Sequence, residues 1–401
     1  MIWLFLASLF FLFRIKIQKN ITLLGPFGFF IGYQIIYNII PWLASILDLK
    51  LFSLSGETDL LAAQLLIGSF CNVAFGIVYF MAWRPTAAPV ITASVYRINP
   101  QILFGLAYLP TLYMVQHYGW NNFGQVMQTG GTPTLLNSIA SFMKLFLIAC
   151  FIHCLSLFRF SRSNLTILGG MILLLFVDGA RTNFMMIISL CLFFAYDGGR
   201  LRVSTKNVTG IGLVFVIFVL SRSLRLQNDF YQNILDTFLA EGIIGSYMNI
   251  QTIYILKYFP NISPTFGANY FIDPVISLTP LSSMINGSFD NWITRISPNL
   301  IETFAPVGGF YYTAEALASF GWSGPAFITT LYAIITVKLN NELTRNPNIY
   351  LLYLCTFGCL FSKTQFINCF KLFVVILICY YTIQFILTVN PSNTKHPKET
   401  P

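Results

Sequence analysis

The stretch LLAAQLLIGSFCNVAFGIVYFMAW, residues 60–83, decides the class of fold, because it contains no charged residue. A helix of about 20 apolar residues is long enough to cross the roughly 30 Å hydrocarbon core of a membrane. The whole chain of 401 residues has the same character, with 56% hydrophobic and 9% charged residues and a mean hydropathy of +0.70. Soluble domains carry about 25% charged residues, so the composition excludes an ordinary soluble protein and predicts an all-α polytopic integral membrane protein.

Ten further apolar runs predict about eleven transmembrane helices within a single membrane domain, residues 1–401. Five of these runs are long, at 21–44, 101–118, 135–158, 323–339 and 367–389. Five are shorter and become spans if flanking residues join the helices, at 1–13, 165–177, 182–196, 208–220 and 349–361.

The distribution of charge predicts the orientation, because Lys and Arg accumulate on the cytoplasmic side of membrane proteins. With a periplasmic N-terminus, fourteen of the 23 Lys and Arg residues fall in cytoplasmic segments and seven in periplasmic ones. Eleven of the 14 acidic residues then lie on the periplasmic side. The net charge of +9 therefore reflects orientation in a membrane, and it requires no nucleic-acid partner.

One segment is far longer than the other connections, the predicted large periplasmic loop at 221–322. Loops of this length are usually functional or disordered. The apolar residues Phe238, Ile243, Tyr247 and Ile250 recur at helical spacing, which predicts an amphipathic helix near the membrane interface. Only 390–401 resembles a frayed tail, and it is predicted to be cytoplasmic.

Several kinds of chemistry lack their motifs in this sequence. There is no phosphate-binding GxxxxGK[ST] loop, no HExxH, no GxSxG and no Asp-x-Asp pair. Nucleotide hydrolysis, zinc hydrolysis and transfer from nucleotide sugars therefore lose support. We expect neither a cofactor nor a metal ion, and the eight cysteines all lie in apolar runs where they are expected to pack as free thiols.

The turn Asp178-Gly179-Ala180-Arg181-Thr182-Asn183 is the most informative polar stretch between two apolar runs. Only 34 residues separate Arg162 from Asp197, so each flanking helix keeps roughly fourteen or fifteen residues and reaches about 22 Å. This is shorter than the bilayer, so Arg181 is predicted to lie below the outer surface, in a polar cavity. The alternative is an Asp178–Arg181 ion pair that caps a hairpin at the interface.

Other basic residues could converge on the same cavity. Arg222 and Arg225 share a helical face at the outer end of a span, Arg295 follows in the large loop, and Lys144 is predicted near mid-bilayer. A guanidinium group matches the oxygens of phosphate, so these residues predict a site for a lipid-linked phosphate or pyrophosphate. The alternative for the three arginines is solvation at the interface.

The last polar cluster, residues 302–324, precedes the predicted span at 323–339. It contains the carboxylates Glu302 and Glu315 and the aromatic residues Tyr311 and Tyr312. Carboxylates act as general bases toward sugar hydroxyls, and aromatic faces stack on sugar rings. The alternative is that the two carboxylates pair with loop arginines or cap a helix.

These features resemble the Wzy-type O-antigen and oligosaccharide repeat-unit polymerases. The resemblance rests on about eleven spans, one long periplasmic loop late in the chain, Gly179-x-Arg181 in a short hairpin, and Glu315 followed by Phe320-Gly321-x-x-Gly324. It implies a fold like that of C-type glycosyltransferases and O-antigen ligases. It also implies metal-independent glycosyl transfer, on the periplasmic face, from one undecaprenyl-pyrophosphate-linked glycan to the terminal sugar of another. A chain-length regulator protein would be a partner.

Two other functions stay open. An O-antigen ligase or another lipid-linked glycosyltransferase would differ in its acceptor, which the sequence does not specify. A flippase or transporter of lipid-linked oligosaccharides is disfavoured, because transporters tend to show paired repeats with polar residues at the midplane. Here the two halves differ and the polar residues concentrate on one side.

The predicted topology can be tested with reporter fusions. Fusions after Lys206 and Arg345 should report a cytoplasmic location, and one after Asn261 should report a periplasmic location, because of the bias of basic residues. A cytoplasmic signal from the fusion after Asn261 would overturn the predicted orientation.

Overall fold

The structure is a computed structural model that describes the following parts of the chain. They are residues 1–21, 25–46, 57–84, 245–259, 263–279, 312–341, 347–362 and 365–387, together with 145–153 and single residues at 102–103, 105–106, 109, 112–113, 116, 142, 186, 189–190 and 292. The chain divides into two compact units, one made of residues 1–89 and 188–373, the other of residues 90–187 and 374–401.

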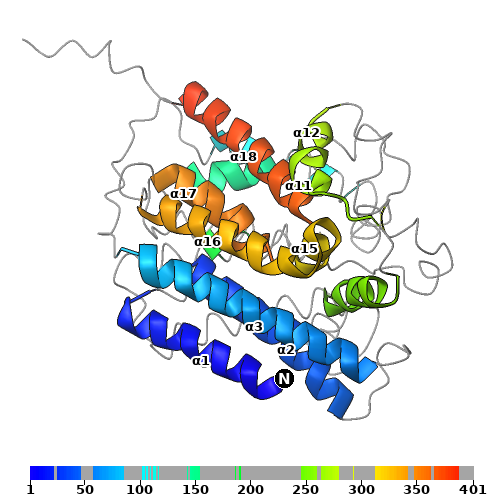
Figure 1. The fold of residues 1–401 in the computed structure, drawn as a ribbon. Coiled ribbons are helices and arrows are strands. Elements are labelled where there is room, and N and C mark those ends of the chain that lie inside the picture. The colour runs from blue at the N-terminus through cyan, green and yellow to red at the C-terminus, as the bar shows by residue number, and fades with distance from the viewer. Residues whose placement is uncertain are drawn as a thin grey trace, which may run out of the picture. The chain divides into compact units, whose positions relative to one another are not determined.

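The described residues form helices and no strands. The elements are α1 (Ile2–Gln18), α2 (Pro26–Ile46), α3 (Glu57–Ala82), a helix at 245–258, α11 (Ala268–Phe271), α12 (Asp273–Ser277), α15 (Tyr312–Phe320), the 3₁₀ turn η2 (Gly321–Ser323), α16 (Gly324–Asn341), α17 (Pro347–Tyr353), the π-helical turn η3 (Leu354–Gly358) and α18 (Phe366–Leu387) (Figure 1). All of these elements belong to the first unit, except that residues 374–387 of α18 belong to the second.

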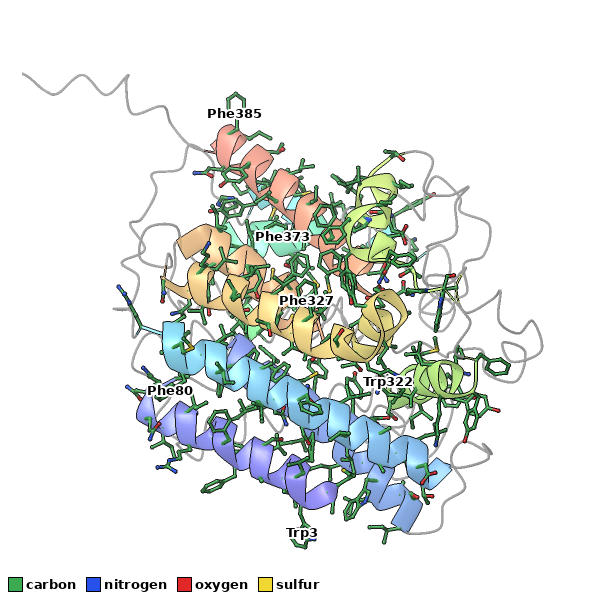
Figure 2. All side chains as sticks on the ribbon, viewed as in Figure 1. Trp3, Phe80, Trp322, Phe327, Phe373 and Phe385 are labelled. Carbon is green, nitrogen blue, oxygen red and sulfur yellow. The ribbon has the colours of Figure 1, made fainter. Side chains whose placement is uncertain are left out.

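Four described stretches are long and apolar enough to cross a membrane. They are Pro26–Ile46, Thr58–Ala82, Tyr312–Asn341 and Phe366–Ile386. Large apolar side chains are exposed, as a lipid environment requires: Trp3 of α1 is 80% exposed and points away from its ribbon (Figure 2), and Phe385 of α18 is 86% exposed. The predicted class, a helical membrane protein, is confirmed. The total of about eleven spans stays a prediction, because most of residues 101–220 lie outside the described parts.

Helices α1 and α3 pack side by side and run in the same direction (Figure 1). Asn72 Nδ2 donates to Ser8 Oγ at 2.9 Å. Two glycines of α3 allow the close approach. A Cβ on Gly68 would lie 2.8 Å from the ring of Phe5, and a Cβ on Gly76 would lie 2.6 Å from the ring of Phe11. The contacts advance together along both helices, which makes the pair parallel.

The remaining long helices follow the predicted alternation. Phe27 near the start of α2 meets Tyr79 near the end of α3, with ring centroids 4.9 Å apart, so α2 is antiparallel to α3. The ring centroids of Tyr332 in α16 and Phe75 in α3 lie 6.2 Å apart, and Asn341 Nδ2 at the end of α16 donates to Ala82 O at the end of α3 at 3.5 Å. Helix α16 therefore runs in the same direction as α3. The predicted directions of these four spans relative to one another are therefore confirmed within the first unit.

Charged residues separate between the two ends of this bundle. Lys16, Lys19, Arg84 and Lys338 lie at or just beyond the C-terminal ends of α1, α3 and α16. At the opposite end, Lys257 Nζ lies 3.5 Å from Asp59 Oδ2 and so joins the 245–258 helix to the start of α3. The basic end corresponds to the predicted cytoplasmic side.

The predicted amphipathic helix in the large loop needs a correction. A helix is present at 245–258, but it is enclosed by protein for most of its length. Its polar residues Ser246, Asn249 and Thr252 are as fully buried as the apolar Ile250 and Ile253. Only its last turn, from Lys257 onward, is exposed. Over its described part, which includes Tyr247 and Ile250, the periodicity therefore indicated a helix correctly, whereas Phe238 and Ile243 lie outside the described residues. The expected exposed polar face is wrong, because other elements of the chain cover it.

A tight hairpin of α15 and α16 gives the glycines of the FGxxG pattern a structural role. Gly321 ends α15 with φ +63°, a conformation that glycine adopts without strain. A Cβ on Gly324 would lie 2.0 Å from the backbone oxygen of Ala316. The hydroxyls of Tyr312 and Thr329 then hydrogen-bond at 2.6 Å, so α15 folds back along the first turns of α16.

We expect Gly324→Ala to destabilise the protein strongly, because its Cβ would collide with backbone that no rotamer change can move. Overpacking of this kind costs about 1–3 kcal/mol or more. Thermal unfolding of the purified protein in detergent measures the effect. Gly32→Ala in α2 is the matched control, because no atom lies within 4 Å of its added Cβ. The control should unfold at or above the wild-type temperature, and equal loss in both variants would contradict the close approach.

Candidate functional site

Glu315 lies in the middle of α15 and is 1% exposed. Its Oε2 accepts a hydrogen bond of 2.9 Å from the backbone N–H of Phe366, the first residue of α18. The first N–H groups of a helix have no partner within the helix, and the positive end of its dipole favours a carboxylate. The capping role considered for Glu315 is therefore confirmed, and it explains how a carboxylate is stabilised inside the protein.

Small side chains let other elements enclose α15. Ala314, Ala316 and Ala318 are fully buried. Ala314 and Ala318 pack in one apolar cluster with Met248 and Ile255 of the 245–258 helix and with Trp292. All residues from Tyr312 to Ser319 are buried as a result. The large loop thus folds over the helix that carries the predicted base.

A polar network joins α15 to the segment before α11. Ser319, one turn after Glu315, donates to Asn269 Oδ1 at 2.5 Å or to the backbone oxygen of Glu315 at 2.8 Å. Thr265 Oγ1 also donates to Asn269 Oδ1 at 3.0 Å, and the Thr265 N–H donates to Ala318 O at 3.0 Å. These bonds hold α11 against the face of α15 that carries Glu315.

A left-handed glycine makes this approach possible. Gly267 has φ +78° and precedes α11. A Cβ there would lie 2.8 Å from the ring of Phe320 at the end of α15. A larger residue would therefore be strained in its backbone and would also push α11 away from α15.

Tyr270 of α11 completes the surroundings of Glu315. Its ring centroid lies 5.1 Å from that of Phe366 and 6.2 Å from that of Phe320. Burial, and after it the nearby Glu315 carboxylate, raises the pKa of the Tyr270 hydroxyl well above its ordinary range. The hydroxyl therefore stays protonated at physiological pH and keeps a hydrogen that it can donate.

Two of the predicted site residues lie in the described parts of the chain. Glu315 and Tyr312 share α15, but Tyr312 packs against Phe361, with ring centroids 4.9 Å apart, and bonds to Thr329 on the side of α16. The other predicted residues lie outside the described parts, so their convergence stays a prediction. They are Glu302, Arg181, Arg222, Arg225, Arg295, Lys144 and Tyr311.

Sequence reasoning did not find Asn269, Tyr270 and Ser319. Ser319 follows Glu315 by one helical turn, and this spacing could have indicated it. Asn269 and Tyr270 belong to a short helix of four residues, where no periodicity shows which side chains point inward. Fifty residues separate Asn269 from Ser319 along the chain, so only the fold brings them together.

The arrangement provides a carboxylate, a phenol and an amide in surroundings largely closed to water. A carboxylate there can accept a proton from a hydroxyl group, and the neutral groups can hydrogen-bond a polar ligand. Among the described residues, no group of three His, Cys, Asp or Glu lies close enough to bind a metal ion. Six of the cysteines are described; these six are buried and form no disulfide.

We expect Glu315→Ala to lower the free energy of unfolding by about 1–3 kcal/mol, because the N–H of Phe366 would lose its buried acceptor. Glu315→Gln should cost less, because the amide oxygen can accept the same bond. Denaturant unfolding of the two variants measures the difference. Equal stability of Glu315→Ala and the wild type would show that the bond contributes nothing.

Comparisons of the chain with models of known protein families, with curated proteins and with solved structures found no match.

Proposed function

We propose that this protein is a polymerase of lipid-linked oligosaccharides, as in O-antigen biosynthesis. It transfers the glycan of one undecaprenyl-pyrophosphate-linked repeat unit to the terminal sugar of another. The observation that carries this proposal is the position of Glu315. Its carboxylate is buried on α15, which folds back along α16 within the apolar stretch Tyr312–Asn341, at the end of the bundle away from the basic residues.

In the proposed reaction a hydroxyl of the acceptor sugar attacks the anomeric carbon of the donor glycan. A new bond forms between that carbon and the hydroxyl oxygen, while the bond from the carbon to the pyrophosphate oxygen breaks. Undecaprenyl pyrophosphate leaves with the electron pair, and Glu315 accepts the hydroxyl proton. Glu302 is the second candidate for the base. The reaction needs no metal ion and no cofactor.

Arginines are proposed to stabilise the leaving pyrophosphate. Arg181 would bind it, and Arg222 or Arg225 would assist, because a guanidinium group forms paired hydrogen bonds to phosphate oxygens. Arg295, Lys144, Tyr311 and Tyr312 are proposed to complete the binding of the pyrophosphate and glycan. The burial of Glu315 supports the requirement for such a shielded site, since developing charge is stabilised more strongly away from water.

The proposed location is the bacterial inner membrane, with a periplasmic N-terminus and a cytoplasmic C-terminus. The basic residues at one end of the bundle support it, because the opposite end, with Asp59, Lys257 and α15, would then face the periplasm. Lipid-linked oligosaccharides are the proposed substrates, and a chain-length regulator is a proposed partner. The C-type glycosyltransferase fold with about eleven spans belongs to the same proposal.

The test uses the full-length protein in lipid nanodiscs with lipid-linked repeat units and a chelator. Wild-type protein should lengthen the glycans. Glu315→Gln should lower the rate by roughly 10²–10⁴-fold, because the amide can keep the bond to Phe366 but cannot accept a proton. Asp59→Asn is the matched control: it makes the same change at an exposed carboxylate at the same end of the bundle, and its activity should stay near that of wild type.

Each alternative outcome has a separate meaning. Wild-type activity in Glu315→Gln would remove Glu315 from the reaction. Activity that the chelator abolishes and a divalent cation restores would contradict the metal-independent mechanism. Transfer to the lipid A core without transfer to a repeat unit would indicate a ligase. Movement of the lipid-linked glycan across a vesicle without a new glycosidic bond would indicate a transporter.

A further inference from the structure

Two buried hydrogen-bond donors beside Glu315, the hydroxyl of Tyr270 and the Nδ2 of Asn269, have no partner among the residues that the structure describes. Tyr270 is 8% exposed and Asn269 is 2% exposed. An unsatisfied buried donor costs about 1–3 kcal/mol, so folded proteins retain few of them. Two such donors on adjacent residues beside a buried carboxylate can both donate to one polar ligand.

Asn269 and Tyr270 both contact residues that neighbour the carboxylate of Glu315 or bond to it. Asn269 Oδ1 accepts from Ser319, which lies one helical turn after Glu315. The Tyr270 ring packs on Phe366 with centroids 5.1 Å apart, and the N–H of Phe366 donates to Glu315 Oε2. The two donors therefore approach Glu315 from α11, while α18 approaches it from its first residue.

The chemistry of these groups selects the kind of ligand. Two donors require acceptor oxygens, whereas a carboxylate is itself an acceptor. A hydroxyl group both donates and accepts. A phosphate offers only acceptors at neutral pH, and its charge would be repelled by Glu315 in surroundings of low dielectric constant. The aromatic rings of Tyr270, Phe320 and Phe366 add apolar surface of the kind on which sugar rings stack.

We propose that Tyr270 and Asn269 form a sugar-binding subsite, in which the phenol and the amide donate to hydroxyl oxygens of the sugar whose own hydroxyl lies on Glu315. The description of that sugar as the acceptor rests on the proposed polymerase function. The pyrophosphate of the donor binds elsewhere, away from this carboxylate. Tyr270 and Asn269 thus orient the attacking hydroxyl toward its base.

The key variant is Tyr270→Phe, which removes one oxygen atom and keeps the ring packing on Phe366. Because this hydroxyl has no partner among the described residues, the variant should unfold at or above the wild-type temperature. The probe is the free oligosaccharide that mild acid releases from lipid-linked repeat units. Saturation-transfer NMR with the full-length protein in nanodiscs should show binding about tenfold weaker in Tyr270→Phe.

Tyr353→Phe is the matched control. Its hydroxyl is hydrogen-bonded to Thr336 of α16, so the variant should lose stability and keep its affinity for the oligosaccharide. Inorganic pyrophosphate should not displace the oligosaccharide from the wild type. The proposal is overturned if the wild type does not bind the oligosaccharide, if Tyr270→Phe binds it equally well, or if pyrophosphate displaces it. It is also overturned if Tyr270→Phe unfolds well below the wild type, because the hydroxyl would then have a partner in the protein.

The binding assay tests the sugar-binding subsite, and the polymerisation assay tests the polymerase function, so either proposal can be rejected without the other. Binding that depends on Tyr270, without polymerisation by the wild type, would keep the subsite and reject the polymerase function. Polymerisation by the wild type, with unchanged binding and an unchanged KM for the acceptor in Tyr270→Phe, would keep the function and reject the subsite.

Discussion

The close approach of the backbones of α15 and α16 is the constraint on which the described site depends. At Gly324 there is no space for a Cβ, because the backbone oxygen of Ala316 occupies its position. Without a side chain there, α15 can fold back along α16. Other parts of the chain then enclose α15, namely the 245–258 helix, α11 and the first residue of α18. The described surroundings of Glu315 follow from this arrangement.

A buried carboxylate must accept hydrogen bonds, and the backbone N–H at the start of α18 donates one to Glu315. The bond from Phe366 has a structural effect, because it satisfies an N–H that α18 leaves free. It also has a chemical effect, because it fixes the position of the carboxylate. A carboxylate offers about four acceptor positions, so a capping bond and a bond to a substrate hydroxyl are compatible. Structural and catalytic roles for Glu315 therefore do not exclude one another.

The direction of the helices gives the first unit two chemically different ends. Because α1, α3 and α16 run the same way, their basic C-terminal residues gather at one end. The hairpin of α15 and α16, the start of α18 and the Asp59–Lys257 pair lie at the other end. The polar network around Glu315 thus forms where elements of the long loop meet the starts of two membrane helices. A reaction that takes place on one side of a membrane needs its polar groups at one end of the bundle, as in this arrangement.

The sequence by itself determined the class of protein, the approximate position of the described spans, the directions of α1, α2, α3 and α16 relative to one another, and Glu315 as a polar residue of interest. These properties are local: a run of apolar side chains, a bias of Lys and Arg, and a carboxylate before an FGxxG pattern need no distant contact to be recognised. The tertiary structure alone decided that the 245–258 helix is enclosed and that Asn269 and Tyr270 lie beside Glu315. Periodicity shows that one face of a helix differs from the other, but it does not show what covers each face. Contacts between residues about fifty positions apart depend on how the backbone folds back, and here that depends on glycines at 267, 321 and 324.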